Sequence, residues 1–571
     1  MNIFDNPQHK AQIGYNPFDM SKTIKFSSSV GHILPVYYDL LNPGDKITAS
    51  SILRTRTMPL DSGAFTSIEE NIDWFFVPME QIYHAFTEFY YGVQDFNTSL
   101  MNPASFGNRY PYINFTTLCS VACSSLSSYN LDFEAVETFR SGALRLLDLL
   151  GFPIDQVLYA NSEQLSNNYA IIPILLQVYQ KIYMDYYRLS DREANDPRSY
   201  NVDDYYANNE IQNPQDIAKM LRLHYVPWKK DFYTNLQISP IFGPDQVSGV
   251  NNYDYSAVNQ WLSSTFNLDL IDKDGASNSA QPTTVGYDSA SILQNGQGLN
   301  VANIRAMFAL DKLLEITRRA GKHYDKQTLA HFGVDVPNGI SGECYLLNRS
   351  QSRIDIGDVI ATGTGSASVG EQTATSVLGQ VGGKGFGANE TGKFDFEAPC
   401  HGVLMAVYYA RPVADYYQKG IDKLNTLIES VDWFKPEFDN LGQVPLFKAQ
   451  VAFDPEDSDV NSEIVGWWYR YSEIKAKPNS IHGNMSYIDN FKIWSTGKAP
   501  ISSSSLSHFL VNPNYLNSIM MVDYESKPAT AGLGNNATTF SQLFGTDPLL
   551  HQIYFDVRKA SKMSTFGLPQ L

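Results

Sequence analysis

The sequence has few cysteines and no long apolar run. None of its four cysteines belongs to a C-x-x-C pair, and the C-x-x-x-C spacing of Cys119 and Cys123 has no histidine nearby. Together with Cys344 and Cys400, these residues are expected to be buried free thiols of a protein from a reducing compartment. The N-terminal residues MNIFDNPQHKAQIGYNPF contain no apolar signal-peptide core, and no segment offers the roughly 18 uninterrupted apolar residues of a membrane helix. We therefore expect a soluble protein that folds in a cytoplasm without membrane insertion.

Basic residues are also in the minority. The formal net charge is -18, from 42 Lys and Arg against 60 Asp and Glu. A protein that gripped DNA alone through a basic surface is expected to be basic overall. Either nucleic acid is not a partner, or the basic groups are confined to one local face.

The common catalytic motifs H-E-x-x-H, G-x-S-x-G and G-x-G-x-x-G after a strand are missing. The stretch GANETGKF (387–394) has the spacing of a phosphate-binding loop, but Phe394 stands where a magnesium-binding hydroxyl is required. The stretch LDLIDKDGASNSAQ resembles a calcium loop through Asp272 and Asp274, yet its first and twelfth ligand positions carry Leu and Gln. We predict a flexible loop and a solvated turn, no catalytic activity and no cofactor, and a structural cation such as calcium has no support.

Aromatic residues are plentiful, with 35 Tyr and 32 Phe. This composition favours β-sheet surfaces and broad contact interfaces, and it also fits a sugar-binding protein. Two runs rich in β-branched and aromatic residues, GHILPVYYDLL and KITASSILRTRTMPL, flank a Pro-Gly turn and predict neighbouring strands. Further strands are predicted over 71–83, 400–412, 445–453, 463–478 and 489–495.

The middle of the chain has helical periodicity. Helices are predicted over 133–153, 173–189 and 299–321, and the second has its apolar side chains in one stripe. That stripe consists of Leu176, Tyr179, Tyr183 and Tyr187. The order of strands, then helices and loops, then strands predicts one mainly β domain interrupted by long insertions.

The predicted organisation has five parts. An extended N-terminal arm covers 1–30, and the β domain covers 31–571. Within that domain lie a helical insertion (101–238), a polar insertion (240–298) and a Gly/Ser/Thr-rich loop (361–393). Loops of this length are usually functional or disordered.

Two groups of residues are candidates for contacts. Trp467 and Trp468 are adjacent, so on a strand they point to opposite sides, one to a core and the other to a partner or a carbohydrate. With Tyr469 they are the candidates for a protein contact. The basic residues of the arm and of the C-terminal VRKASKM are solvated or meet phosphate; they are Lys10, Lys22, Lys25, Arg558, Lys559 and Lys562.

Several segments, taken in order, resemble a known family. They are GHILPVYYDLLNPGDKI, NIDWFFVPMEQIYHAF, LLGFP, LHYVPWKKDFYT, LNVANIRAMFALDKLLEITRRAGKHYDKQTLAHFGV, HGVLMAVYYARPVADYYQKGID and VGWWYRYSEIKAKPNSIHGNM. This series resembles the major capsid protein of Microviridae, the small icosahedral single-stranded DNA phages, on the gokushovirus-like side. It brackets nearly the whole chain, whereas residues 101–132 and 520–550 depart from the pattern.

The resemblance implies a single eight-stranded antiparallel jelly roll, sixty copies of which form a T=1 shell around circular single-stranded DNA in a virion assembled in the bacterial cytoplasm. It implies three partners, namely a small basic DNA-packaging protein, a DNA pilot protein and a host receptor. The packaging protein would explain how an acidic shell encloses DNA. The resemblance also implies a protrusion at the three-fold axes, for which 240–298 is the candidate, with possible host contacts at Asn252, Tyr253, Tyr255, Asp272 and Asp274.

The competing hypothesis is a secreted or surface carbohydrate-binding or adhesin protein, similar in its wealth of Tyr and Trp to the outer-membrane starch-binding lipoproteins of gut bacteria. Those proteins carry an export signal with a lipidated cysteine and are mostly helical. This chain begins without such a signal and its pattern is β-rich. The sequence therefore favours the capsid hypothesis.

Overall fold

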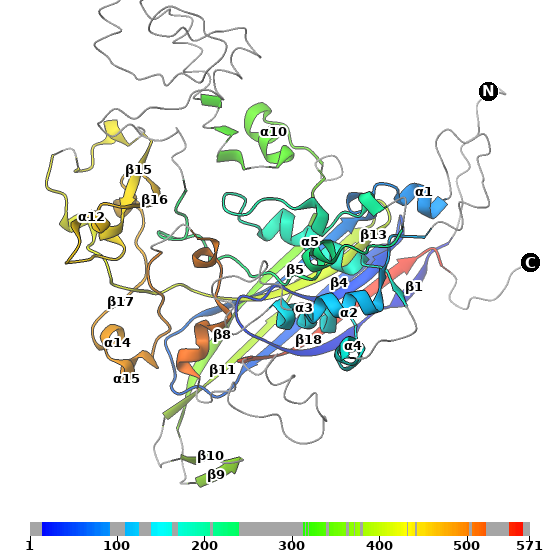
Figure 1. Cartoon of the computed structure of the whole chain (residues 1–571), viewed down its shortest axis with the longest axis horizontal. Helices are drawn as coiled ribbons and strands as arrows, with labels where there is room; N and C mark the ends of the chain where they lie inside the picture. The colour runs from blue at the N-terminus through cyan, green and yellow to red at the C-terminus, as the bar shows by residue number, and fades with distance from the viewer. Residues whose placement is uncertain are drawn as a thin grey trace, which may run out of the picture.

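The main sheet of the computed structural model contains ten antiparallel strands (Figure 1). Eight of them follow one another in the order β1-β18-β4-β11-β8-β5-β13-β3, while β12 pairs with β4 and β2 with β18. The strands are β1 Asn16–Asp19, β2 Lys22–Ser28, β3 Leu34–Leu41, β4 Lys46–Thr57, β5 Ile68–Pro78, β8 Tyr345–Ile360, β11 Val381–Glu390, β12 Phe394–Glu397, β13 Gly402–Pro412 and β18 Leu549–Ser561. The structure describes residues 14–91, 109–124, 139–162, 169–205, 209–238, 342–360, 365–369, 372–376, 381–430, 432–439, 442–501, 505–520 and 547–563, and most of 312–337.

The sheet curls so that its inner face closes on itself. Trp74 of β5 contacts Phe555 of β18, although β8, β11 and β4 separate these strands in the sheet. Both rings are fully buried, and Tyr37 of β3 packs against both. The core therefore lies inside the curl, where large aromatic side chains bury the most apolar area.

The two halves of the sheet differ on their outer face. β5 is buried along its whole length, and β13 nearly so. In β4 and β18, by contrast, buried and exposed residues alternate, as expected for strands with one face in solvent. One half of the sheet is covered on both sides, and the other half is open on its outer side.

Helices between β5 and β8 cover the outer face of the first half (Figure 1). The Tyr stripe predicted over 173–189 is confirmed, because Tyr179, Tyr183 and Tyr187 are all buried. The hydroxyl of Tyr187 donates to Asp73 of β5 at 2.6 Å. The elements between β5 and β8 are α1 Phe86–Tyr91, β6 Ile113–Asn114, α2 Phe115–Ala122, α3 Phe139–Leu149, α4 Ile154–Ser162, β7 Ala170–Ile171, α5 Ile174–Ile182 with a π-helical turn Tyr183–Tyr187, α6 Pro214–Leu221 and, apart from the sheet, α10 Tyr324–Phe332. Short 3-10 turns lie at Met79–Gln81, Pro197–Ser199 and Asp203–Tyr205.

A second insertion, between β13 and β18, lies to one side of the sheet (Figure 1). The strand predicted over 463–478 ends at Tyr469, since Tyr471 has a φ of 62° and a helix follows. The strand predicted over 489–495 is wrong, because this segment forms α15 and its Trp494 ring packs on Phe65. The elements are β14 Tyr416–Tyr417, β15 Gln443–Phe447, α12 Ser458–Asn461, β16 Ile464–Tyr469, α13 Ser472–Lys475, β17 Ser480–Ile481, α14 Asn484–Tyr487 and α15 Asp489–Lys492. The 3-10 turns are Lys423–Asn425, Pro436–Phe438, Lys448–Gln450, Leu506–Phe509 and Pro513–Ile519.

The Gly/Ser/Thr-rich loop predicted over 361–393 is wrong for most of its described residues. They form the hairpin β9 Gly365–Val369 and β10 Gln372–Ser376, and then β11. In β11, glycines occupy alternate positions on the inner face, and a Cβ on Gly387 would lie 2.6 Å from Oε2 of the buried Glu70. Gly387 of GANETGKF therefore permits close packing within the sheet, whereas Gly392 follows the strand and has open space around it.

The described part of the predicted N-terminal arm, residues 14–30, is not free. β1 and β2 are extended, but both pair with β18 along the edge of the main sheet. Because these pairs satisfy the backbone N–H and C=O groups of the segment, it belongs to the sheet. None of the helices that the structure describes is both long and apolar enough to cross a membrane.

Candidate functional site

The uncovered side of β2, β18, β4 and β11 forms a surface that we call the open face. Its pairing register aligns Leu550 with Arg56 and Arg56 with Phe386. Two residues further along, Gln552 is opposite Arg54. The exposed residues of the open face include Lys25, Arg54, Arg56, Lys384, Phe386, Leu550, Gln552, Tyr554 and Arg558. Cationic and aromatic side chains thus come together from four strands.

Four cations of the open face lack an ion-pair partner in the part of the chain that the structure describes. No carboxylate among the described residues forms an ion pair with Lys25, Arg54, Arg56 or Lys384. Three carboxylates accompany them, namely Asp355 opposite Phe386, Glu390 opposite Ile52, and Asp556 of β18, which lies 3.4 Å from Arg558. The open face therefore has a local excess of positive charge on a chain whose net charge is -18.

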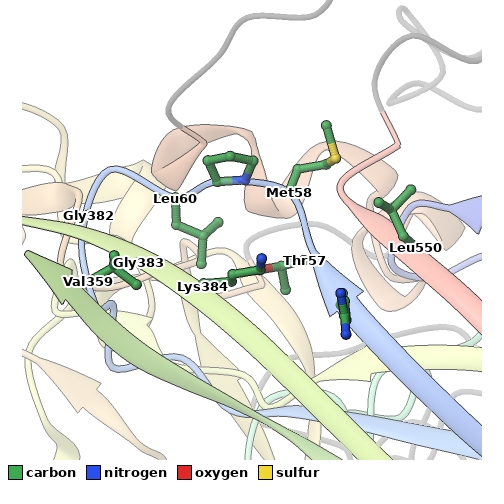
Figure 2. A pocket seen from close by; sticks show the side chains of 10 residues that line it. Thr57, Met58, Leu60, Val359, Gly382, Gly383, Lys384 and Leu550 are labelled. Carbon is green, nitrogen blue, oxygen red and sulfur yellow. The ribbon is translucent and has the colours of Figure 1, made fainter. Parts of the chain in front are cut away.

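A pocket of about 400 Å³ lies at one end of the open face (Figure 2). Figure 2 shows Leu60 and Val359 on one side, Leu550 on the other, and Lys384 with Thr57 between them. The lining residues are Arg56, Thr57, Met58, Pro59, Leu60, Val359, Gly382, Gly383, Lys384 and Leu550. The pocket combines apolar walls with two cations, a combination that suits a flat apolar group carrying negative charge.

Most of the basic residues suggested by the sequence lie away from this surface. Lys559 is buried, and its ammonium group lies 3.1 Å from Asp39 and 3.7 Å from Asp45. This double ion pair makes Lys559 part of the folded core, which corrects the expectation of a solvated or DNA-facing residue. Burial lowers the pKa of Lys22, whose ammonium group lies 4.9 Å from the ring centres of Tyr37 and Tyr38.

The remaining predicted cations differ in their surroundings. Arg558 is exposed and lies 3.4 Å from Asp556, and Lys562 is 5.5 Å from the ring of Tyr15. Lys10 lies outside the described residues. Of the six, Lys25 and Arg558 lie on the open face, and Arg558 is paired there with Asp556. Arg54, Arg56 and Lys384 were missed, although the alternation in LRTRT could have indicated an arginine face on a strand.

The two tryptophans are both inside the fold. Trp467 and Trp468 are 8% and 7% exposed, so the prediction that one of them faces a partner is wrong. Residues 232–237 cover β16, with Phe232 and Tyr233 against Trp468 and a backbone bridge to Trp467. Tyr469 is exposed, as a contact residue must be.

Exposed apolar side chains are numerous elsewhere in the same insertion. Ile428 is 90% and Trp433 60% exposed, although large apolar side chains are usually buried. We call this set the insertion surface. It comprises Ile421, Leu424, Ile428, Trp433, Phe434, Phe447, Phe453, Ile464, Tyr469 and Ile474. Where exposed apolar side chains adjoin one another, they mark sites of protein contact.

The predicted host-contact residues Asn252, Tyr253, Tyr255, Asp272 and Asp274 all lie outside the described residues. Within the part of the chain that the structure describes, no group of three or more His, Cys, Asp or Glu side chains could hold a metal ion.

Comparison with known proteins identifies the family. Residues 8–106 and 157–531 match the model of a family described as capsid protein (F protein). The chain belongs to this capsid protein family. The resemblance to the capsid proteins of Microviridae is therefore confirmed.

Two curated capsid proteins are similar to the chain. It is 22% identical to capsid protein VP1 of Chlamydia phage 1 over 198 residues, which cover 34% of this chain and 32% of that protein. It is 23% identical to capsid protein VP1 of Bdellovibrio phage phiMH2K over 298 residues, half of each chain. The matched parts thus span about a third and a half of these relatives.

Membership in the capsid protein family changes what counts as a functional site. A capsid protein acts through surfaces that meet neighbouring copies and cargo, and a structural family speaks against a catalytic role. The insertion surface and the open face are the two described surfaces with the chemistry for such contacts.

Proposed function

We propose that this chain is the major capsid protein of a small phage, and that sixty copies close a T=1 icosahedral shell around circular single-stranded DNA. The match to the capsid protein family over 8–106 and 157–531 is the observation that carries this proposal. The particle is the virion, assembled in the cytoplasm of the bacterial host. The small basic DNA-packaging protein, the DNA pilot protein and a host receptor are its partners.

The strand order supports an eight-stranded jelly roll of the viral capsid type. We number the long strands from one to eight in chain order, as β2, β3, β4, β5, β8, β11, β13 and β18. In these numbers, strands 1-8-3-6 lie side by side in the sheet and are followed by strands 5-4-7-2. Such interleaving of first and last strands is the arrangement of two nested Greek keys. The two helical and loop insertions then leave the jelly roll after β5 and after β13.

The insertion surface is the proposed contact between neighbouring copies. A stable contact between proteins commonly buries about 800 Å² on each partner and centres on aromatic and aliphatic anchors. Ile428 and Trp433, the most exposed large side chains of this surface, are the proposed anchors. Tyr469, already a candidate from the sequence, lies in the same set.

Particle formation tests the proposal. Co-expressed with its packaging partners, the chain is expected to form shells of uniform diameter in negative-stain electron microscopy. Ile428→Asp is expected to lower the yield of shells about tenfold or more, because a loss of about 1.4 kcal/mol per contact is tenfold in association and every copy carries it. Its melting temperature should stay close to that of the parent, since surface substitutions rarely change stability by more than about 0.5 kcal/mol.

Asn425→Asp is the matched control, because it adds the same charge at an exposed polar position of the same segment. Equal shell yields for both variants would remove Ile428 from the contact. Persistent monomers of the parent chain that bind an oligosaccharide would overturn the capsid proposal itself.

Residues 240–298 are the proposed three-fold protrusion that meets the host. Deleting 245–293 is expected to leave shell formation intact and to reduce adsorption to host cells, because the segment would be an insertion into an otherwise complete domain. Adsorption assays and microscopy of the same preparation measure the two effects. Loss of shells in the deletion variant would contradict the assignment.

A further inference from the structure

The open face has the layout of a stacking platform. Phe386 is 52% and Tyr554 40% exposed, and both project from strands rather than from loops. Arg56 lies beside Phe386 on the neighbouring strand, about 5 Å away in the hydrogen-bonding direction. Arg54 lies in the next row, about 7 Å along the strand. Phe386 thus has Arg56 beside it on β4, while Tyr554 lies opposite Ile52, two rows further along the same sheet.

The charge of this surface limits its occupant. Lys25, Arg54, Arg56 and Lys384 face solvent and have no ion-pair partner among the described residues, and of the three nearby carboxylates Asp556 is paired with Arg558. On a chain of net charge -18, most of the surface repels a polyanion, and this area attracts one. A polyanion that also presents flat apolar groups matches both features, because bases stack on aromatic rings while phosphates pair with guanidinium groups.

The pocket extends the same pattern. Its apolar walls, formed by Met58, Leu60, Val359 and Leu550, adjoin Arg56 and Lys384 (Figure 2). A volume of about 400 Å³ falls in the range of small-molecule sites. It accommodates one unstacked base whose phosphate reaches the two cations.

We propose that the open face is a site for single-stranded nucleic acid, in which bases stack on Phe386 and Tyr554 and phosphates pair with Arg54, Arg56 and Lys384. The pocket holds a further base at the end of the strand. Binding is largely independent of base sequence, because every base has a face that can stack. The inference rests on the proposed function, in which the shell encloses single-stranded DNA, and it names the surface that meets that DNA.

Two variants of the full chain separate the contributions of charge and stacking. The probe is a fluorescent oligothymidylate, and its binding is measured by anisotropy at several salt concentrations. In Arg54→Gln/Arg56→Gln/Lys384→Gln, the slope of log affinity against log salt is expected to become shallower by about 2, from about 0.7 per lost phosphate contact on a single strand. Phe386→Ala is expected to weaken binding by about tenfold while leaving that slope unchanged.

Arg558→Gln is the matched control. It removes an exposed cation from β18, but Asp556 and Asp19 lie 3.4 and 4.0 Å from that guanidinium and already balance it. This variant should bind as the parent does. Parent-like binding by both the triple variant and Phe386→Ala would overturn the proposal. Weakening of a polyglutamate probe to the same extent as the oligothymidylate would assign the surface to an acidic polypeptide instead.

The failure of this inference can be told apart from failure of the proposed function. If the open face binds DNA, the triple variant should still form shells, but shells with a lower ratio of absorbance at 260 to 280 nm. Normal shells with a parent-like DNA content would sink the inference and leave the capsid proposal intact. If the parent forms no shells, the proposed function fails, while oligonucleotide binding by the unassembled chain still reports on the open face.

Discussion

Replacing Asp547 with alanine is expected to lower the free energy of unfolding by about 3–5 kcal/mol, because it removes the carboxylate partner of a buried guanidinium group. Nη1 and Nη2 of Arg145 donate to the two carboxylate oxygens of Asp547 at 2.7 and 2.9 Å. The two side chains are only 6% and 3% exposed. The hydroxyl of Ser27 donates to the same carboxylate at 2.7 Å.

This pair joins distant parts of the chain. Arg145 lies in α3, Ser27 in β2 and Asp547 just before β18. The interaction therefore ties a helix of the first insertion to the edge of the main sheet, and its loss should loosen both. Urea denaturation followed by tryptophan fluorescence measures the change.

Two controls make the result interpretable. Glu463→Ala removes a carboxylate that lies 2.8 Å from Lys448 but is 59% exposed, and it should cost at most about 1 kcal/mol. The double variant Arg145→Met/Asp547→Leu should recover much of the lost stability, since it leaves no unpaired charge. An Asp547→Ala variant no less stable than Glu463→Ala would show that water or another group compensates the guanidinium.

Acidification is expected to destabilise the fold strongly between about pH 6.5 and pH 3. Burial lowers the pKa of His551 to about 3, and the side chain is fully enclosed in the core. Its two ring nitrogens lie 2.8 Å from the Ser28 hydroxyl and 2.9 Å from the Thr55 hydroxyl. In the unfolded chain the same imidazole takes up a proton near pH 6.5.

The direction of the change in stability with pH follows from the number of protons that the folded and unfolded states bind. Between these two pH values the unfolded state holds a proton on His551 that the folded state does not, so stability falls as the pH falls. The contribution is fully present above about pH 6.5 and is worth on the order of 5 kcal/mol, at about 1.4 kcal/mol per pH unit over about 3.5 units. Burial also holds the pKa of His224 well below its usual range, which adds to the effect.

The neighbouring Glu70 has the opposite effect on the pH dependence of folding stability. Its carboxylate lies 3.6 Å from His551, and burial raises its pKa. The folded state therefore keeps a proton that the unfolded state has already lost, so this contribution is present at low pH and is lost as the pH rises through the folded pKa of Glu70.

Chemical denaturation at a series of pH values tests the prediction. His551→Gln is expected to flatten the loss of stability between pH 6.5 and pH 3 relative to the parent. His482→Gln replaces an exposed histidine and should retain the parent's slope. If the slope of His551→Gln equals that of the parent, His551 is not the group responsible.

The sequence predicted those strands and helices in which the spacing of apolar residues matches the face that the element buries. The runs that became β3, β4, β5 and β13 are rich in β-branched and aromatic residues, and the Tyr stripe of α5 repeats at helical spacing. The glycine-rich strand β11 was not predicted. Its glycines are needed because Glu70 and other residues distant in sequence pack closely against the strand. Composition cannot distinguish a strand of this kind from a flexible loop.

The residues by themselves determined the family, the mainly β class and the central helices, since short-range sterics and the spacing of apolar residues are encoded within each segment. The acidic net charge left two possibilities open, that nucleic acid is not a partner or that the basic groups are confined to one local face. The structure supports the second. Only the tertiary structure decided which cations are available. The curl of the sheet aligns Arg54 and Arg56 of β4 with residues of β11 and β18, while it buries Lys559 between Asp39 and Asp45. Pairing register and burial depend on contacts between segments hundreds of residues apart, and no local pattern contains that information.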